Sequence, residues 1–447
     1  MKGRLEEQEG GRGLTRRGLL AGVGLSCAAA ALSGCGTEDQ GVEGSSPRRQ
    51  GAGAGSGAAA ARDQEWSRIR EQFRLDPEYI HLAGLLIASH PDPVREAVER
   101  YRQELDRNPG LYLPGNNSRL EDEVRRAAAD YLGAQPHDIA LTDSTTMGIG
   151  LVYNGVQVRE GHELLTGRWD YYSTRAALKF KANRSGATYR EIEPYRDIRT
   201  VSEDELVEAL IGRVRPNTRV VAITWVHSST GLMLPVRSIA DRLAEVNAAR
   251  EPGDRALLCV DGVHGLGVED AGMADLGCDF FMAGTHKWIF APRGTGVLWG
   301  KPQTRGAVTP TIPTFTSDAG WGGVMTPGGF KAFEHRWAMT DAFRFHQEMG
   351  KARVQQRIHL LARQLKEGLA GMSHVTLYTP MDHALSAGIV CFDVAGMSEN
   401  QVVARLRERN IIASTTPYSP SHARLTPGVY NTTEEMERTL SVIRELA

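Results

Sequence analysis

The chain has 447 residues, of which 41% are hydrophobic and 24% are charged, and its formal net charge is -2. This length is sufficient for two domains with a sizeable buried core. The near-neutral charge argues against a nucleic-acid-binding protein, which would need a basic surface. The sequence contains no internal repeat that would indicate a solenoid.

The first 35 residues differ from the rest of the chain and predict an export signal. Arg16 and Arg17 precede an apolar run that is too short to span a bilayer comfortably, and small residues lead to Cys35. The arginine pair resembles a twin-arginine signal, and the run LSGC resembles a lipobox whose cysteine is lipidated. The alternative is a chance basic pair before an uncleaved anchor. We expect a protein that works outside the cytoplasm, in the periplasm or as a membrane-anchored lipoprotein.

Residues 36–63 consist largely of Gly, Ala and Ser, which predicts a flexible linker. Beyond the linker the chain holds three cysteines, an odd number that cannot all pair internally. Cys259 and Cys391 lie in strand-like runs. We interpret these two and Cys278 as small buried hydrophobic residues.

Helix and strand signals alternate from Trp66 onward. The run HPDPVREAVERYRQELDR has one apolar helical face, and SRLEDEVRRAAADYLG predicts a helix with a Ser118–Glu121 capping box and an end at Gly133. Short apolar runs separated by helical patterns follow: HELLTG, RVVAITWV, RALLCVD, CDFFMAG and TGVLWG. This alternation predicts an α/β fold with a parallel sheet covered on both faces.

The pattern changes after TGVLWG. An irregular stretch leads to a predicted long helix from about Thr340 to Met372, then to the strands VTLYT and GIVCFDV and two capped helices. This predicts a smaller α+β domain in the C-terminal third of the chain. The domain boundaries that we predict are an N-terminal arm at 64–89, a large domain at 90–305 and a small domain at 306–447.

Polar residues follow three of the predicted strands. Asp261 follows RALLCV, Lys287 follows CDFFMAG, and HSSTG follows VVAITWV. In such sheets, ligands bind beyond the carboxyl ends of the strands. A lysine and an aspartate together suit pyridoxal phosphate (PLP), which forms a Schiff base with a lysine and has a ring nitrogen that an acidic partner keeps protonated. If Lys287 is considered without its neighbouring motifs, an ordinary surface lysine at a strand end is the better interpretation.

Two further motifs support the cofactor. LTDSTTMGIG places Ser144, Thr145 and Thr146 at the start of a helix, where hydroxyl and backbone N–H groups can hold a phosphate, although an ordinary N-cap is the alternative. WDYYS offers Tyr171 or Tyr172 to cover the cofactor ring, unless these aromatic residues serve packing.

Taken together, VDGVHGLG, AGTHKW, DSTTMGI and ARLTPGVYNTTEEM resemble the class V aminotransferases among the fold type I PLP enzymes, and within them the isopenicillin N epimerase-like branch. The similarity runs from about Tyr79 to Glu445. The resemblance implies a large domain with a mainly parallel seven-stranded sheet and a smaller α+β domain. It also implies a homodimer with the active site at the subunit interface.

The resemblance also implies a role for individual residues. Lys287 matches the lysine that binds PLP, and Asp261 matches the partner of its ring nitrogen. Arg424 matches the arginine that binds the substrate carboxylate, a role that suits its bidentate fork. The remaining cofactor contacts are His264 at the phenolic oxygen, Thr145, Thr146, the backbone of Met147 and His286 at the phosphate, Tyr171 on the ring, and Ser228, where desulfurases carry an asparagine.

The chain also departs from the family pattern. Cysteine desulfurases need a nucleophilic cysteine on a loop of the C-terminal domain, and no cysteine follows Cys391. Arg336 and Trp337 stand where many relatives have Gly-Thr at the partner subunit's phosphate, and Thr285 replaces a residue that is often small. Because no cysteine follows Cys391, desulfuration by a nucleophilic loop cysteine is not expected. The sequence predicts no metal site.

These observations predict an exported PLP enzyme that acts at the α-carbon of an amino acid or a peptide-linked amino acid, as an aminotransferase or an epimerase-like enzyme. One alternative is a periplasmic enzyme that modifies a secreted peptide or siderophore by oxidative decarboxylation or lyase chemistry. A second alternative is a non-catalytic, membrane-tethered binding protein of the same fold. Analogy at the level of the fold does not choose among these reactions.

Overall fold

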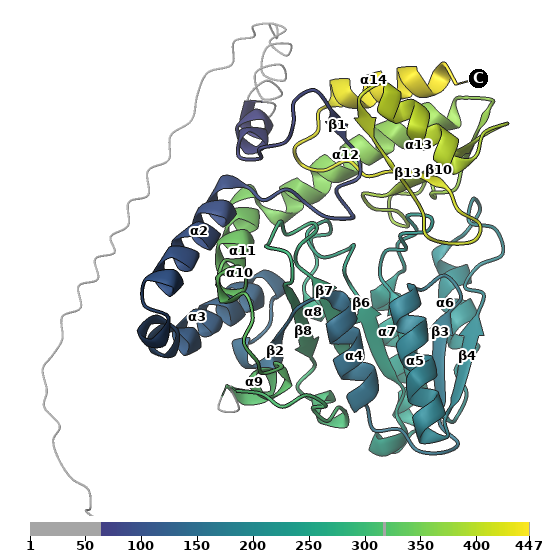
Figure 1. The fold of residues 1–447 in the computed structure, drawn as a ribbon. Helices are drawn as coiled ribbons and strands as arrows, with labels where there is room; N and C mark the ends of the chain where they lie inside the picture. Colours follow the sequence, from purple (N-terminus) through teal and green to yellow (C-terminus); the bar gives the residue numbers. More distant parts are fainter. Residues whose placement is uncertain (1–63, 316–318, 447) are drawn as a thin grey trace, which may run out of the picture. The chain divides into compact units, whose positions relative to one another are not determined.

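The computed structural model of the protein describes residues 64–315 and 319–446 (Figure 1). Its central element is a seven-stranded sheet in the order β2-β8-β7-β6-β5-β3-β4. The pairs from β7 through β4 are parallel, and β8 is antiparallel to both of its neighbours. The expected mainly parallel seven-stranded sheet is confirmed. The strands are β2 (Ile139–Thr142), β3 (Glu163–Gly167), β4 (Thr188–Ile192), β5 (Thr218–Thr224), β6 (Leu257–Asp261), β7 (Phe280–Gly284) and β8 (Gly296–Gly300).

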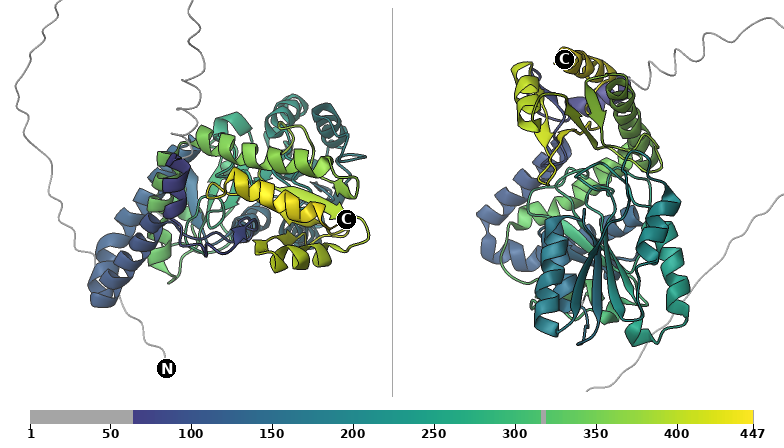
Figure 2. Two further views of the ribbon diagram at one scale, coloured as in Figure 1. Left: turned by 90° about the horizontal axis from the view of Figure 1, so that it is seen from above. Right: turned by 90° about the vertical axis from the view of Figure 1, so that its right-hand side faces the viewer.

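Helices cover both faces of this sheet, as the right-hand view of Figure 2 shows. Successive side chains of a strand point to opposite faces, so each strand feeds two hydrophobic clusters. In β5, Val220 and Ala222 pack with residues of α4 and α5, whereas Val221 and Ile223 pack with residues of α6 and α7. These helices are α4 (Thr145–Gly155), α5 (Tyr172–Ser185), α6 (Glu203–Ile211) and α7 (Val236–Ala248), and the short α8 (Met273–Leu276) follows β6. Burial on both faces explains why the strands read as continuous apolar runs.

A second, four-stranded antiparallel sheet has the order β12-β13-β10-β9. Residues of the three helices α12, α13 and α14 share its hydrophobic cluster, which also takes in Ile80 and Leu82. Capping boxes at Ser398 and Thr432 start α13 and α14, which confirms the two capped helices. The elements are α12 (Lys351–Ala370), β9 (Val375–Leu377), β10 (Val390–Val394), α13 (Glu399–Glu408), β12 (Ser414–Thr415), β13 (Ala423–Leu425) and α14 (Thr433–Arg444), with β1 (Ile80–His81) paired to β11 (Ile411–Ile412).

Further helices pack at the β2 edge of the main sheet and against one another. They are α2 (Asp92–Arg107), α3 (Pro109–Leu132), α9 (Gly320–Met325), α10 (Phe333–Trp337) and α11 (Met339–Met349). None of the helices in the described ranges is long and apolar enough to cross a bilayer.

Two predicted helix boundaries were wrong. Ser118 does not cap a helix, because α3 already begins at Pro109 and runs through Pro114. The Asn117 side chain accepts a hydrogen bond from the Trp337 indole at 3.2 Å, which connects this part of α3 to α10. The predicted long helix is two helices, since Gly350, with a φ of 82°, separates α11 from α12. The predicted end of α3 at Gly133 is confirmed, with a left-handed φ of 63°.

Candidate active site

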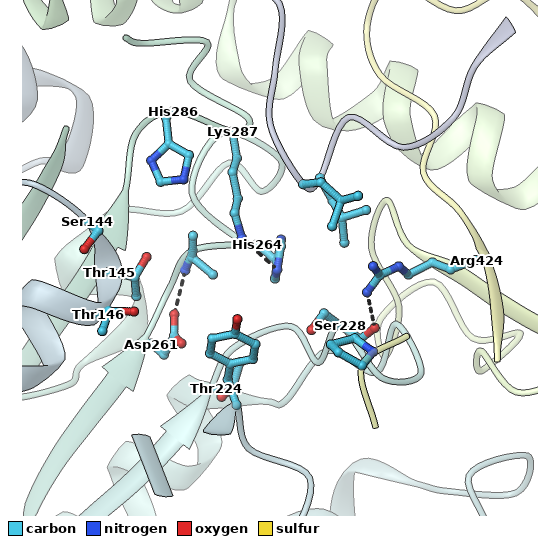
Figure 3. Close-up of a pocket in the computed structure, with 15 residues that line it drawn as sticks. Ser144, Thr145, Thr146, Thr224, Ser228, Asp261, His264, His286, Lys287 and Arg424 are labelled. Carbon is cyan, nitrogen blue, oxygen red and sulfur yellow. Dashed lines mark hydrogen bonds between the residues drawn. The ribbon is translucent and has the colours of Figure 1, made fainter. Parts of the chain in front are cut away.

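The carboxyl ends of β5, β6 and β7 lie side by side and carry the candidate site. Thr224 at the end of β5 pairs in register with Asp261 at the end of β6, and β7 ends three residues before Lys287. Beside these ends is a cavity of about 290 Å³ (Figure 3). Its lining consists of Leu85, Leu86, Ser144, Thr145, Thr146, Tyr171, Thr224, Ser228, Asp261, Val263, His264, His286, Lys287, Pro417 and Arg424. The sheet therefore brings together the side chains that the sequence motifs singled out.

Lys287 and His264 contact each other in this cavity. The Lys287 Nζ lies 3.4 Å from the His264 Nε2, and the Trp288 indole N–H donates to the His264 Nδ1 at 3.2 Å. Because an indole N–H can only donate, the Nδ1 must accept, and the neutral ring carries its proton on Nε2. Burial, followed by the charges of Lys287, Arg424 and His286, lowers the pKa of His264 well below its usual range. The Nε2–H therefore points toward Lys287 as a donor.

The Lys287 amine, in its neutral form, can accept a hydrogen bond from the His264 Nε2–H. Burial lowers the pKa of Lys287 from 10.5 to about 8; Asp261 opposes the shift and Arg424 adds to it. A neutral amine has a lone pair that accepts from an N–H donor, whereas an ammonium has none. A lysine with this pKa can act as a nucleophile and as a base near neutral pH.

Asp261 lies at the floor of the cavity and is 1% exposed. Its Oδ1 accepts the Val263 backbone N–H at 3.1 Å. Burial raises the pKa of Asp261 from 3.8 to about 6, while the Val263 N–H and the Lys287 charge work in the opposite direction. A cation placed against this carboxylate would favour its ionised form. The site is therefore suited to a protonated ring nitrogen.

Hydroxyl groups lie at the N-terminus of α4, on the side of Lys287 that faces away from Arg424 (Figure 3). The Thr145 Oγ1 accepts the Gly284 N–H at 2.7 Å, and the Thr146 and Ser173 hydroxyls lie 3.2 Å apart. A hydroxyl that accepts one bond still has its own proton to donate to an anion. Together with the helix N-terminus and His286, this end of the cavity suits a phosphate.

Arg424 on β13 lies at the opposite end of the cavity and is 1% exposed. Its guanidinium donates to the Ser228 carbonyl at 2.8 Å, the Ser414 hydroxyl at 3.1 Å and the Thr415 carbonyl at 3.1 Å. All three partners are neutral oxygens. A buried guanidinium that has only neutral partners is stabilised by an anionic ligand. This end of the cavity therefore suits a carboxylate.

Tyr171 lines the cavity, whereas Tyr172 is 61% exposed. Ser228 also lines the cavity, and its hydroxyl lies 2.9 Å from the Tyr418 hydroxyl. Met147 does not line the cavity; its backbone N–H donates to the Ser144 hydroxyl at 3.1 Å, so the ordinary N-cap interpretation holds at this position.

Two further residues from the motifs lie away from the cavity. Thr285 is fully buried and its hydroxyl lies 2.7 Å from that of Thr295, so this residue points into the core. Arg336 donates to Glu121 at 3.0 Å and to Asp143 at 3.3 Å, and this pairing occupies the guanidinium within the chain. Cys35 and the arginine pair lie outside the described residues.

The three cysteines among the described residues are free and buried, as predicted: Cys259, Cys278 and Cys391. Burial raises the pKa of the Cys391 thiol from 9.0 to about 12, which keeps it protonated. None of the three lines the cavity.

Several lining residues were not predicted from the sequence. Leu85 and Leu86 come from the segment between β1 and α2, and Pro417 comes from the loop between β12 and β13, in the same part of the chain as Arg424. Leu86 is 54% exposed, and its sequence context gave no signal of a place at the site. Val263 and Thr224 belong to runs that read simply as strand ends.

The donor set as a whole fits PLP. Around one cavity lie a lysine amine, a buried carboxylate, a fixed imidazole N–H donor and a hydroxyl-rich helix N-terminus, which are the kinds of group that would hold a Schiff base, a ring nitrogen, a phenolic oxygen and a phosphate. No group of His, Cys, Asp and Glu in the described residues could hold a metal ion.

Known proteins are similar to this chain in sequence over most of its length. An isopenicillin N epimerase of Amycolatopsis lactamdurans is 29% identical over 414 residues, which is 86% of this chain and 98% of the relative. The Streptomyces clavuligerus isopenicillin N epimerase is 26% identical over 84% of this chain and 96% of its own. A probable cysteine desulfurase of Vibrio cholerae is 23% identical over 82% of this chain and 93% of its own.

Solved structures show the same fold. A mutant of C-DES with glycine covalently linked to its PLP cofactor matches with a TM-score of 0.76 at 22% identity, over 84% of this chain and 99% of that one. The apo cysteine desulfurase from Thermococcus onnurineus NA1 matches with a TM-score of 0.74 at 22% identity, over 85% and 97% of the two chains. Residues 88–438 match the aminotransferase class-V family. The chain therefore belongs to the class V aminotransferase family, which uses PLP on the fold type I scaffold.

Proposed function

We propose that the protein acts at the α-carbon of an amino acid, or of a peptide-linked amino acid with a free carboxylate, as an epimerase-like enzyme or an aminotransferase. One observation carries this proposal: Lys287, His264 and Asp261 share a single cavity with the buried cation of Arg424. The two isopenicillin N epimerases, which match over nearly their whole length, support chemistry at an α-carbon.

The residues of the site would hold PLP in a defined orientation. Asp261 would face the ring nitrogen, His264 the phenolic oxygen, and Thr145, Thr146 and His286 the phosphate, with Tyr171 against the ring. When bound, PLP supplies an electron sink that makes the α-proton of an attached amino acid acidic. Asp261 sustains that sink because its carboxylate favours a protonated ring nitrogen.

Lys287 is the group that would move the proton. With a pKa of about 8, its amine is partly neutral near neutral pH and can remove a proton from the α-carbon and return it. Arg424 would hold the substrate carboxylate, which fixes the rotation about the bonds at the α-carbon. Return of the proton to the same face of the α-carbon would give exchange, and its return to the opposite face would give epimerisation. With PLP bound, the same amine would also be placed to move the proton as transamination requires.

The experiment that tests this function is α-proton exchange in deuterium oxide, followed by proton NMR. The cofactor-loaded protein is incubated with a panel of L- and D-amino acids and short peptides with free carboxylates. We expect loss of the α-proton signal for a subset of the panel. Chiral chromatography and a keto-acid assay on the same samples then separate epimerisation from transamination.

Two variants make the result interpretable. Lys287→Ala should abolish the exchange, because the base is removed. Lys366→Gln serves as the matched control, since burial also lowers the pKa of Lys366 to about 8 but this residue lies outside the cavity. Exchange that persists in Lys287→Ala at the rate of the unmodified protein, or that is lost equally in both variants, contradicts the proposal.

We also propose that the protein is exported and works as a homodimer. The arginine pair and the lipobox-like LSGC support export, and the family resemblance supports the dimer. Cell fractionation of the full chain and of a Cys35→Ala variant tests the first proposal; recovery of both in the cytoplasm contradicts it. Light scattering of the purified protein tests the second, and a monomeric mass contradicts it.

A further inference from the structure

A polar pair lies buried beside the carboxyl ends of β3 and β5, next to the floor of the site. Asp170 follows β3 and His227 follows β5, and each is 1% exposed. Neither residue lines the cavity. The mechanism described above gives neither residue a role, yet buried ionisable groups are costly and usually have one.

Asp170 ties the ends of two strands together. Its Oδ2 accepts the Gly167 N–H at 2.6 Å and the Thr166 hydroxyl at 2.8 Å, and its Oδ1 accepts the Thr224 N–H at 2.6 Å. Thr166 and Gly167 end β3, and Thr224 ends β5. Three such donors favour the ionised carboxylate. Burial raises the pKa of Asp170, but His227 and these donors outweigh it, so the net pKa is lowered.

His227 is the group that can balance this buried charge. Its Nε2 lies 3.7 Å from the Asp170 Oδ1, and neither ring nitrogen has a hydrogen-bond partner within the described part of the chain. A buried imidazole without a hydrogen bond is unfavourable unless its charge interacts with a neighbour. A carboxylate at ion-pair distance in a poorly screened interior provides that interaction.

The pair is connected to Asp261 through the backbone and through space. Thr224, which Asp170 holds, pairs in register with Asp261, and the Trp225 N–H donates to the Asp261 carbonyl at 2.9 Å. The negative charge of Asp170 disfavours ionisation of Asp261, and a positive charge on His227 favours it. Without a charge on His227, the two carboxylates would therefore oppose each other.

We propose that His227 and Asp170 are a positioning pair for Asp261: Asp170 fixes the strand end beside it, and His227, at ion-pair distance from Asp170, offsets the Asp170 charge so that Asp261 stays ionised against the cofactor's ring nitrogen. This inference rests on the proposed role of Asp261. It assigns the pair no contact with substrate or cofactor. Its effect should appear in the state of the ring nitrogen itself.

The test uses PLP labelled with ¹⁵N in the ring, bound to the full protein at one neutral pH, with the ring nitrogen observed by NMR. We expect the ¹⁵N signal of the unmodified protein at the position of a protonated ring. In His227→Gln it should move toward the unprotonated position, and the cofactor Kd should rise about tenfold, the change that corresponds to a pKa shift of about one unit. Adding Asp170→Asn to His227→Gln removes the unbalanced charge but replaces one of the two acceptor oxygens at the strand ends by an NH2 group, so it should reverse part of the shift.

Controls separate this inference from the proposed function and from misfolding. His346→Gln alters a fully buried histidine outside the cavity, so it should reduce thermal stability without moving the ¹⁵N signal. Asp261→Asn should move the signal directly; if it does not, the proposed role of Asp261 fails. If Asp261→Asn moves the signal, and a His227→Gln protein that folds correctly does not, the proposed role of Asp261 stands and only the proposal of a positioning pair is overturned. An effect of His227→Gln that the double variant does not reverse even in part also overturns it.

Discussion

The Lys287 amine should be partly neutral at pH 7, and this state sets how fast the protein takes up its cofactor. Burial lowers the pKa of Lys287 to about 8, from 10.5 for an exposed lysine. At pH 7 this corresponds to a neutral fraction of roughly 9%, against roughly 0.03% for an exposed lysine. Since only the neutral amine attacks a carbonyl, the buried lysine should react about 300-fold faster at pH 7 than its ordinary pKa would allow.

Stopped-flow absorbance after mixing the apoprotein with PLP measures this rate directly. Between pH 7 and pH 10, we expect the rate constant to rise up to about pH 8 and then to level off. Arg424→Gln should move the inflection to higher pH, because the Arg424 charge helps to lower the Lys287 pKa. Lys366→Gln should leave the curve unchanged. A rate that keeps rising tenfold per pH unit to about pH 10 would refute the reasoning, because it would indicate an ordinary lysine.

Three other perturbations have defined outcomes. Arg424→Gln should raise the substrate KM by about 10- to 100-fold, as expected for loss of a charged hydrogen bond, while the bound-cofactor absorbance stays; loss of cofactor instead would show that Arg424 has another role. Trp288→Phe removes the N–H that fixes the His264 tautomer, so the inflection of cofactor uptake should move to higher pH, and an unchanged inflection would contradict the tautomer argument. Burial lowers the pKa of His346 from 6.5 to about 4. Between pH 6.5 and pH 4 the unfolded chain therefore binds more protons than the folded chain, so the free energy of unfolding should fall as the pH drops through this range. His346 should account for a loss of about 3 kcal/mol in the free energy of unfolding. Thermal unfolding of the unmodified protein and of His346→Gln, each measured as a function of pH, gives this difference. Equal pH dependence of the two unfolding curves would contradict it.

Much of the site could be predicted because parallel strands place distant residues at one edge. Asp261 and Lys287 each follow a strongly apolar run, and adjacent parallel strands bring such ends together. Arg424 could not be placed this way, since it comes from the four-stranded sheet, and only the family resemblance indicated it. The Trp288–His264 hydrogen bond, which fixes the tautomer, had no signal in the sequence.

The parts of the fold that sequence patterns missed depend on tertiary packing. Pro114 and Asn117 are typical of a turn, yet α3 runs through them because the helix packs against α10 and α11. The short strands β12 and β13 are too brief to show a period of two. His227 is part of the polar motif HSSTG, but nothing in the sequence shows that it lies beside Asp170, which precedes it by 57 positions in the chain.

The most direct test of the central claim is to find which residue carries the cofactor. The PLP-loaded protein is reduced with borohydride, digested, and mapped by mass spectrometry. We expect the cofactor mass on the peptide that contains Lys287, and no labelled peptide from Lys287→Ala. A cofactor mass on another lysine, or unchanged labelling in Lys287→Ala, would contradict the assignment of this cavity as the active site.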